Sequence, residues 1–82
     1  MPRYYFPARE DDTSIPDDEG FELPDLSAAE REALLTLACM GRDLLPTGEV
    51  SSVTIEVWTE DRRRVLAATL TLHIERSDIP PH

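Results

Sequence analysis

The stretch VTIEVWTEDRRRVLAATLTLHI, residues 53–74, carries the clearest structural signal in the chain, because apolar and polar side chains alternate along both of its halves. Such alternation is typical of β-strands that bury one face. The charged centre separates the halves, which predicts an antiparallel hairpin. A slip of one residue would mix the buried and exposed faces. The register that avoids this slip pairs Val57 with Leu66, Ile55 with Ala68 and Val53 with Leu70.

The turn of the hairpin follows from the same register. It places Trp58 opposite Val65 and leaves Asp61-Arg62 as a two-residue turn. Arg is a poor choice where a turn needs positive φ, so a longer loop is the alternative. The second strand is apolar on one face and carries small residues or Thr on the other. This composition predicts a central position in the sheet.

A helix is expected before the hairpin. Ser27 and Glu30 fit a capping box, and Asp25 is the rival N-cap. Pro46 ends the helix, because it disfavours α geometry at the preceding residue. At helical periodicity, one broad face should be buried. It holds Ala29, Ala33, Leu34, Leu37, Met40, Gly41, Leu44 and Leu45.

The N-terminal part predicts two short strands. Residues 4–6 are aromatic strand formers, and Pro7 then removes a backbone donor, which favours a short or edge strand. Residues 8–20 are acidic and rich in turn formers. We expect a long hairpin loop there, with Ile15 either anchored on the core or mobile. A second strand follows at residues 21–23.

Together these elements predict a two-layer α+β domain of ββαββ order, with one helix packed on a four-stranded, mainly antiparallel sheet. The chain has 82 residues, which suffices for one domain and not for two. We expect that domain to span residues 1–76 and the tail at 77–82 to be frayed. Strand order is otherwise left open.

The charge pattern argues against a nucleic-acid partner. The formal net charge is -9, and eight acids lie within residues 1–25. A polyanion would be repelled by this field. Every basic charge is Arg, and the chain contains no Lys, Asn or Gln. Only residues 62–64, with Trp58 and Tyr5 as stacking groups, would favour nucleic acid, and we expect none to bind.

The compartment is expected to be the cytoplasm. Cys39 is the only cysteine, so no intrachain disulfide is possible. The first residues lack the apolar core of a signal peptide. No apolar run approaches the ~20 residues that span a bilayer, so no membrane association is expected.

No constellation of residues predicts catalysis, a cofactor or a metal site. The acidic run before Gly20 lacks the EF-hand spacing. The two histidines, His73 and His82, have no Cys or His at zinc-like spacing. Cys39 lies near the middle of the expected helix, away from the N-terminal dipole that activates a thiol. We therefore expect a protein that is not an enzyme.

The sheet face turned away from the helix is the most suggestive surface, since one helix cannot cover both faces. It is either wetted or an interface, and Trp is enriched at binding hot spots. The candidate interface residues on this face are Trp58, Val65, Ala67, Thr69, Thr71 and His73. Leu35 and Cys39, four residues apart on the outer helix face, form a second candidate patch.

These observations favour a non-enzymatic module that binds another protein or associates with itself. The alternatives are an antitoxin-like protein that binds a partner and a small metal-dependent enzyme using the acidic loop. No cofactor is implied by any of the candidate residues.

Several motifs resemble a family of short bacterial proteins catalogued as domain of unknown function 6894. They are the opening Met1–Phe6, the block Asp18–Leu26, and the pairs Glu56-Val57 and Val65-Leu66 of the hairpin. The resemblance covers residues 1–76 and implies no catalytic residues. The chain departs from it at the final turn, where Asp61-Arg62 replaces Asp-Gly. The layout of strand, acidic segment and Ala-rich helix is also similar to HicB-like antitoxins, without their DNA-binding segment.

Overall fold

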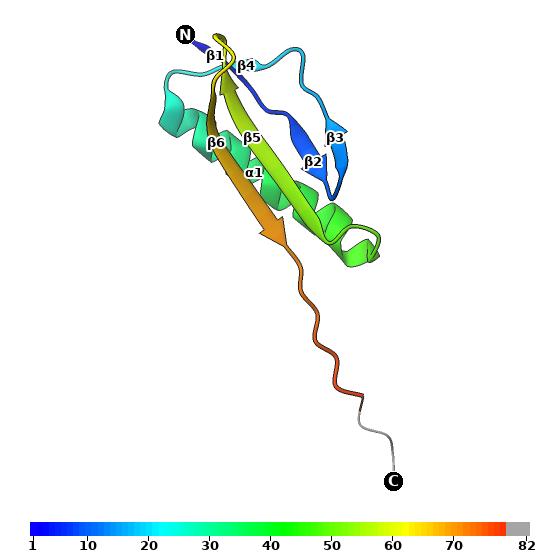
Figure 1. Cartoon of the computed structure of the whole chain (residues 1–82). Helices are drawn as coiled ribbons and strands as arrows, with labels where there is room; N and C mark the ends of the chain where they lie inside the picture. Colours follow the sequence, from blue (N-terminus) through cyan, green and yellow to red (C-terminus); the bar gives the residue numbers. More distant parts are fainter. Residues whose placement is uncertain (79–82) are drawn as a thin grey trace.

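In the computed structural model, which describes residues 1–78, one helix lies on one face of a six-stranded sheet (Figure 1). Every strand pair is antiparallel. The expected α+β class, with one helix on a mainly antiparallel sheet, is confirmed. In chain order the elements are β1 (Arg3–Tyr5), β2 (Ala8–Glu10), β3 (Thr13–Ile15), β4 (Phe21–Glu22), α1 (Leu26–Leu44), the 3-10 helix η1 (Leu45–Thr47), β5 (Ser52–Thr59) and β6 (Arg64–Thr71).

The prediction of four strands is wrong, because the N-terminal part forms four short strands instead of two. β1 and β2 lie end to end along β5 in one continuous register, from Tyr4 opposite Thr59 to Glu10 opposite Val53. The break falls at Pro7, which has no N–H to donate, although its carbonyl still accepts a hydrogen bond from Glu56. β4 pairs with β1, and β3 pairs with β2, on the far side of this line.

The expected long loop at residues 8–20 is therefore a hairpin followed by a short connection. β2 and β3 meet at a tight turn in which Asp11 has a φ of 50°. The Asp11 carboxylate accepts hydrogen bonds from the backbone N–H groups of Ser51 and Ser52, at 3.3 and 3.0 Å. Ile15 is 40% exposed, so it does not anchor this segment on the core.

The central strand is β5, and not β6 as its composition suggested. β5 has β1 and β2 on one side and β6 on the other, whereas β6 pairs with β5 alone. After Arg64, β6 carries no charge, so its sequence did not indicate that its outer side lacks a neighbouring strand among the described residues.

The hairpin register is confirmed in its body and corrected at its turn. The three predicted pairs, Val57–Leu66, Ile55–Ala68 and Val53–Leu70, are all present. A bulge after Val57 then pairs Trp58 with Arg64 instead of Val65. The longer loop is the one adopted, because its ends close through the hydrogen bond from Thr59 N–H to the Arg63 carbonyl (2.9 Å). Arg62, at φ 61°, takes the left-handed position typical of such loops.

Asp25, and not Ser27, caps α1. Its Oδ1 accepts a hydrogen bond of 2.9 Å from the backbone N–H of Ala28. The buried face is narrower than predicted, since Leu34 is 50% exposed. Leu34 shares its flank of the helix with Gly41, which packs against Leu70 of the edge strand, and no strand lies beyond to cover it in the described part of the chain.

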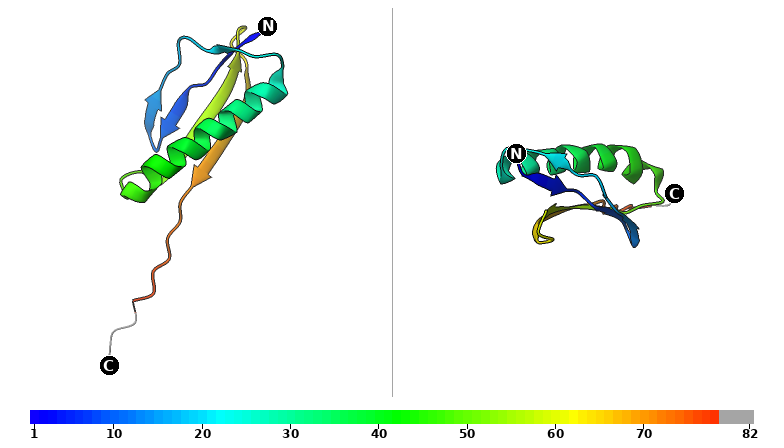
Figure 2. Two further views of the ribbon diagram at one scale, coloured as in Figure 1. Left: turned by 180° about the vertical axis from the view of Figure 1, so that it is seen from behind. Right: turned by 90° about the horizontal axis from the view of Figure 1, so that it is seen from above.

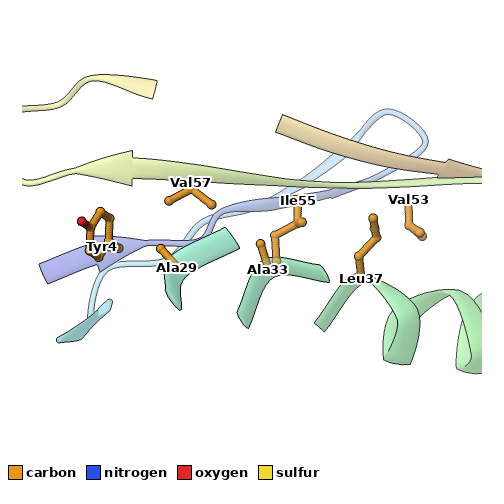
Figure 3. Packing of buried hydrophobic residues seen from close by; sticks show 7 residues of the cluster. All are labelled: Tyr4, Ala29, Ala33, Leu37, Val53, Ile55 and Val57. Atoms are coloured by element: carbon orange, nitrogen blue, oxygen red, sulfur yellow. The ribbon is translucent and has the colours of Figure 1, made fainter. Parts of the chain in front are cut away.

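The core lies between α1 and β5. The small side chains of Ala29 and Ala33 let the helix approach the sheet closely, and both are fully buried. Figure 3 shows Ala29, Ala33 and Leu37 pointing toward Val57, Ile55 and Val53. Tyr4 adds its ring to the cluster from β1.

Past Thr71, the described chain runs on without helix or strand and leaves the body of the domain (Figure 1). The frayed tail expected at residues 77–82 falls mostly on residues 79–82, which lie outside the described residues.

Candidate functional site: a groove on the helix-free face of the sheet

Within residues 1–78, one face of the sheet carries no helix. The view along the sheet in Figure 2 shows α1 on one side only. Strand alternation places Tyr5 and Trp58 next to each other on the helix-free face, since they are register partners on β1 and β5. Pro7 follows Tyr5 on the same face, beside Glu56.

This face is hollowed along β1 and β2. One hollow of about 480 Å³ is walled by Tyr5, Pro7, Pro16 and Trp58. A second, of about 200 Å³, continues it over β2 and shares Pro7 and Pro16 with the first. We call the two hollows together the outer groove. The carboxylates of Asp17, Asp18 and Glu60 and the guanidinium of Arg62 also line it.

Asp17 holds the connection that forms one wall of the outer groove. Its Oδ2 accepts a hydrogen bond from Phe6 N–H at 2.9 Å, and its Oδ1 accepts two more, from Glu19 and Gly20 at 3.1 Å each. Partial burial favours the protonated acid, but the three N–H groups together outweigh it and hold the pKa of Asp17 below its ordinary value. This carboxylate is therefore used to shape the wall.

Glu56 orients the indole of Trp58. The Trp58 Nε1–H donates to Glu56 Oε1 at 2.9 Å, and Arg64 contacts the other carboxylate oxygen at 3.1 Å. The hydrogen bond from Trp58, with the bond and charge of Arg64, lowers the pKa of Glu56 against the effect of partial burial. Trp58 is half-buried, so one part of its ring remains open to the groove.

The predicted interface residues of β6 lie on the same face but beside the groove. Two of them form hydroxyl pairs with β5: Thr69 with Thr54 at 2.9 Å, and Thr71 with Ser52 at 3.3 Å. Ala67 is exposed opposite Glu56. Val65, 40% exposed, is displaced by the bulge and is not the partner of Trp58.

The remaining predicted residues do not join Trp58. His73 lies beyond the far end of β6, where its Nε2 is 3.4 Å from Glu75 Oε1. Leu35 and Cys39 are exposed on the helix layer, on the other side of the sheet. The Cys39 sulfur accepts a contact of 3.6 Å from the Arg42 guanidinium. The predicted residues thus form separate patches.

Sequence reasoning missed Pro7, Pro16 and Asp17 as parts of the site. The signal for Asp17 was present, because an Asp three residues before Gly is typical of a side chain that closes a turn on the backbone. Nothing in the sequence marked Pro7 and Pro16 as parts of the site. They come together beside Trp58 only through the pairing of β1 and β2 with β5 and of β3 with β2.

Within residues 1–78, no three His, Cys, Asp or Glu side chains lie close enough together to hold a metal ion. Over the same residues, every buried side-chain nitrogen and oxygen has a hydrogen-bond partner. None of the described helices is long and apolar enough to cross a membrane.

Comparison with known proteins identifies the family of the chain. No curated protein and no solved structure matches the chain. One family model matches residues 3–71, which begin at the first residue of β1 and end at the last residue of β6. The match therefore spans the whole sheet and its helix, and the chain belongs to the family described as Domain of unknown function (DUF6894).

Proposed function

We propose that the chain is a non-enzymatic interaction module that binds a basic segment of a partner protein in the outer groove. The observation that carries this proposal is the hollow of about 480 Å³ between Tyr5 and Trp58, on the face that no helix covers. Aromatic rings beside open hollows are the usual anchors of protein interfaces. The two prolines add rigid apolar walls that lose little side-chain entropy on binding.

Charge sets the chemistry of the partner. In the larger hollow of the groove, Asp17, Asp18 and Glu60 stand against the single guanidinium of Arg62. In the smaller hollow, Glu56 lies with Arg9, so carboxylates outnumber guanidinium groups in the groove as a whole. The net charge of -9 adds a long-range field that attracts cations. An Arg or Lys side chain of a partner would stack on the rings and approach these carboxylates. Basic segments are therefore favoured over acidic ones.

The alternatives receive less support from the site. A metal-dependent enzyme would need free carboxylates in the acidic loop, whereas Asp17 is committed to three backbone N–H groups. An antitoxin-like role would be one form of protein binding, and its partner would have to present a basic segment to the same groove.

A peptide library displayed on phage, selected against the immobilised chain, tests the proposal. We expect the selected peptides to be rich in Arg or Lys and to change the fluorescence of Trp58, the only Trp of the chain. Binding of a fluorescein-labelled selected peptide should be lost in Trp58→Ala and kept in Leu35→Ala, a matched exposed residue on the other layer. The double variant Asp18→Asn with Glu60→Gln should weaken binding without altering the core.

Two results would overturn the proposal. One is a set of peptides that binds Trp58→Ala as tightly as the unaltered chain. The other is affinity that does not change when the two carboxylates are removed. Circular dichroism of each variant separates loss of binding from loss of fold.

A further inference from the structure

The outer edge of β6 is an open hydrogen-bonding edge. Leu72 donates its backbone N–H to Ser51 at 2.9 Å, so the alternation of an antiparallel strand turns the backbone groups of Ala67, Thr69 and Thr71 away from β5. No other strand of the described chain pairs with this side. These groups are therefore available to another strand.

From Leu66 to Leu72 this edge lacks the features by which proteins protect exposed strands. Charged side chains, prolines, bulges and short length are the usual protections. Residues 66–72 contain no charge and no proline, the bulge at Val65 lies at the hairpin end, and β6 is as long as the central strand. An edge of this kind pairs with another strand when one is available.

Apolar side chains beside the edge also lack cover. Leu70 and Leu72 are 39% and 38% exposed, and Ile74 is 72% exposed. On the helix layer, Leu34 is half exposed on the flank that faces β6. After Leu72, which still bonds to Ser51, the described chain leaves the body of the domain (Figure 1), and Ile74 continues this strip past the end of the sheet.

We propose that two copies of the chain pair through their β6 edges, antiparallel, with a two-fold axis at Thr69. In a two-fold antiparallel pair, the numbers of any two facing residues add up to twice the number of the residue on the axis. The position of the axis therefore determines which residues face each other. With the axis at Thr69, the apolar residues of the helix-facing side meet each other. The contacts are Leu66 with Leu72 of the second copy, and Ala68 with Leu70.

The regular part of β6 selects this register over its neighbours. That part runs from Leu66, just after the bulge at Val65, to Leu72, which still donates to Ser51. Thr69 is its middle residue, so an axis there pairs the whole of residues 66–72 with the same stretch of the second copy. An axis at Ala68 or Leu70 would leave two residues of this stretch in each copy without a partner from it.

This dimer goes beyond the proposed function and uses a different surface. The outer groove lies over β1 and β2, on the other side of β5, and stays open when the β6 edges pair. The result for either surface therefore leaves the other untouched.

Disulfide trapping tests the register. In a Cys39→Ser background, Thr69→Cys places two cysteines on the axis with Cα atoms about 5.5 Å apart, the spacing of a hydrogen-bonded pair and within disulfide range. We expect mild oxidation to give a covalent dimer. Ala67→Cys and Thr71→Cys should not cross-link when each is oxidised alone, but should do so when mixed, since they face each other across the axis. Self-cross-linking of Ala68→Cys or Leu70→Cys with none at Thr69→Cys would overturn this register.

Sedimentation velocity tests the dimer itself. The unaltered chain should sediment as a dimer that dissociates on dilution. Thr69→Lys, which sets two ammonium groups opposite each other, should be monomeric. The matched variant Thr13→Lys, exposed on the opposite edge strand β3, should remain dimeric. A chain that stays monomeric at every concentration, or a Thr69→Lys variant that is still a dimer, would overturn the proposal.

Discussion

The carboxylate of Asp17 accepts a hydrogen bond of 2.9 Å from the backbone N–H of Phe6, at the point where β1 gives way to β2. Asp17→Asn replaces the accepting Oδ2 with an amide group that can only donate. The Phe6 N–H is then left without an acceptor, which costs about 1–3 kcal/mol of the free energy of unfolding. Urea denaturation followed by circular dichroism measures the loss. The exposed neighbour Asp18→Asn should stay within about 0.5 kcal/mol of the unaltered chain, and equal losses in both variants would contradict this role.

The lowered pKa values of Asp17 and Glu56 predict a loss of stability in acid. A carboxyl whose pKa is lower in the folded state stabilises fully above its unfolded pKa, about 4. That contribution is lost as the pH falls from there through the folded pKa. We expect the free energy of unfolding to decrease below about pH 4. In Asp17→Asn the decrease should be smaller, and an unchanged slope would show that Asp17 is not one of the groups involved.

Gly20 and Gly48 form a matched pair, since both have positive φ, 70° and 79°. A Cβ at Gly20 would lie 2.5 Å from the Tyr4 carbonyl oxygen, whereas a Cβ at Gly48 would meet nothing within 4 Å. Gly48→Ala should therefore cost only the left-handed conformation, about 1–2 kcal/mol. Gly20→Ala should cost clearly more, because it also pushes β4 from β1. Thermal unfolding of both variants measures the difference, and equal costs would contradict the close approach at Tyr4.

The sequence predicted those parts of the fold that depend on local periodicity. Alternation alone was enough to pair Val53 with Leu70, and helical spacing identified Ala33 and Leu37 as buried. The predicted turn was wrong because the alternation of the sequence does not reveal a bulge. The bulge makes Arg64, and not Val65, the partner of Trp58.

The order of the strands and the groove could not be predicted for a physical reason. Residues 8–12 are poor strand formers, and Asp11 joins them to the start of β5, about forty residues away in the chain. Tyr5 and Trp58 likewise become neighbours only through the register of β1 on β5. Periodicity shows which face a residue takes but not which strand lies beside it.

Gly41 of α1 packs against Leu70 of β6. This contact predicts that the effect of Gly41→Ala on stability changes sign when Leu70 is shortened to Ala. A Cβ at Gly41 would overlap the Leu70 side chain, so Gly41→Ala gains helix propensity of about 1 kcal/mol but overpacks the contact by about 1–3 kcal/mol. We expect a net loss of stability in the unaltered chain. In a Leu70→Ala background the overlap is gone, and Gly41→Ala should stabilise by about 1 kcal/mol. Urea denaturation of the four proteins completes the cycle, and additive effects would show that the two residues do not constrain each other.

Arg62 lies at φ 61° in the loop between β5 and β6, a conformation that costs a residue with a Cβ about 1–2 kcal/mol. Arg62→Gly relieves this cost, and the greater flexibility of unfolded Gly offsets about half of it. We expect a net stabilisation of up to about 1 kcal/mol. Arg63 does not have positive φ, so Arg63→Gly should destabilise by about 0.5–1 kcal/mol. Thermal unfolding gives both signs, and hydrogen exchange at Thr59 N–H, which closes the loop onto Arg63, reports the same change locally. Shifts of equal sign in the two variants would contradict a strained Arg62, because the flexibility of Gly alone would then explain both.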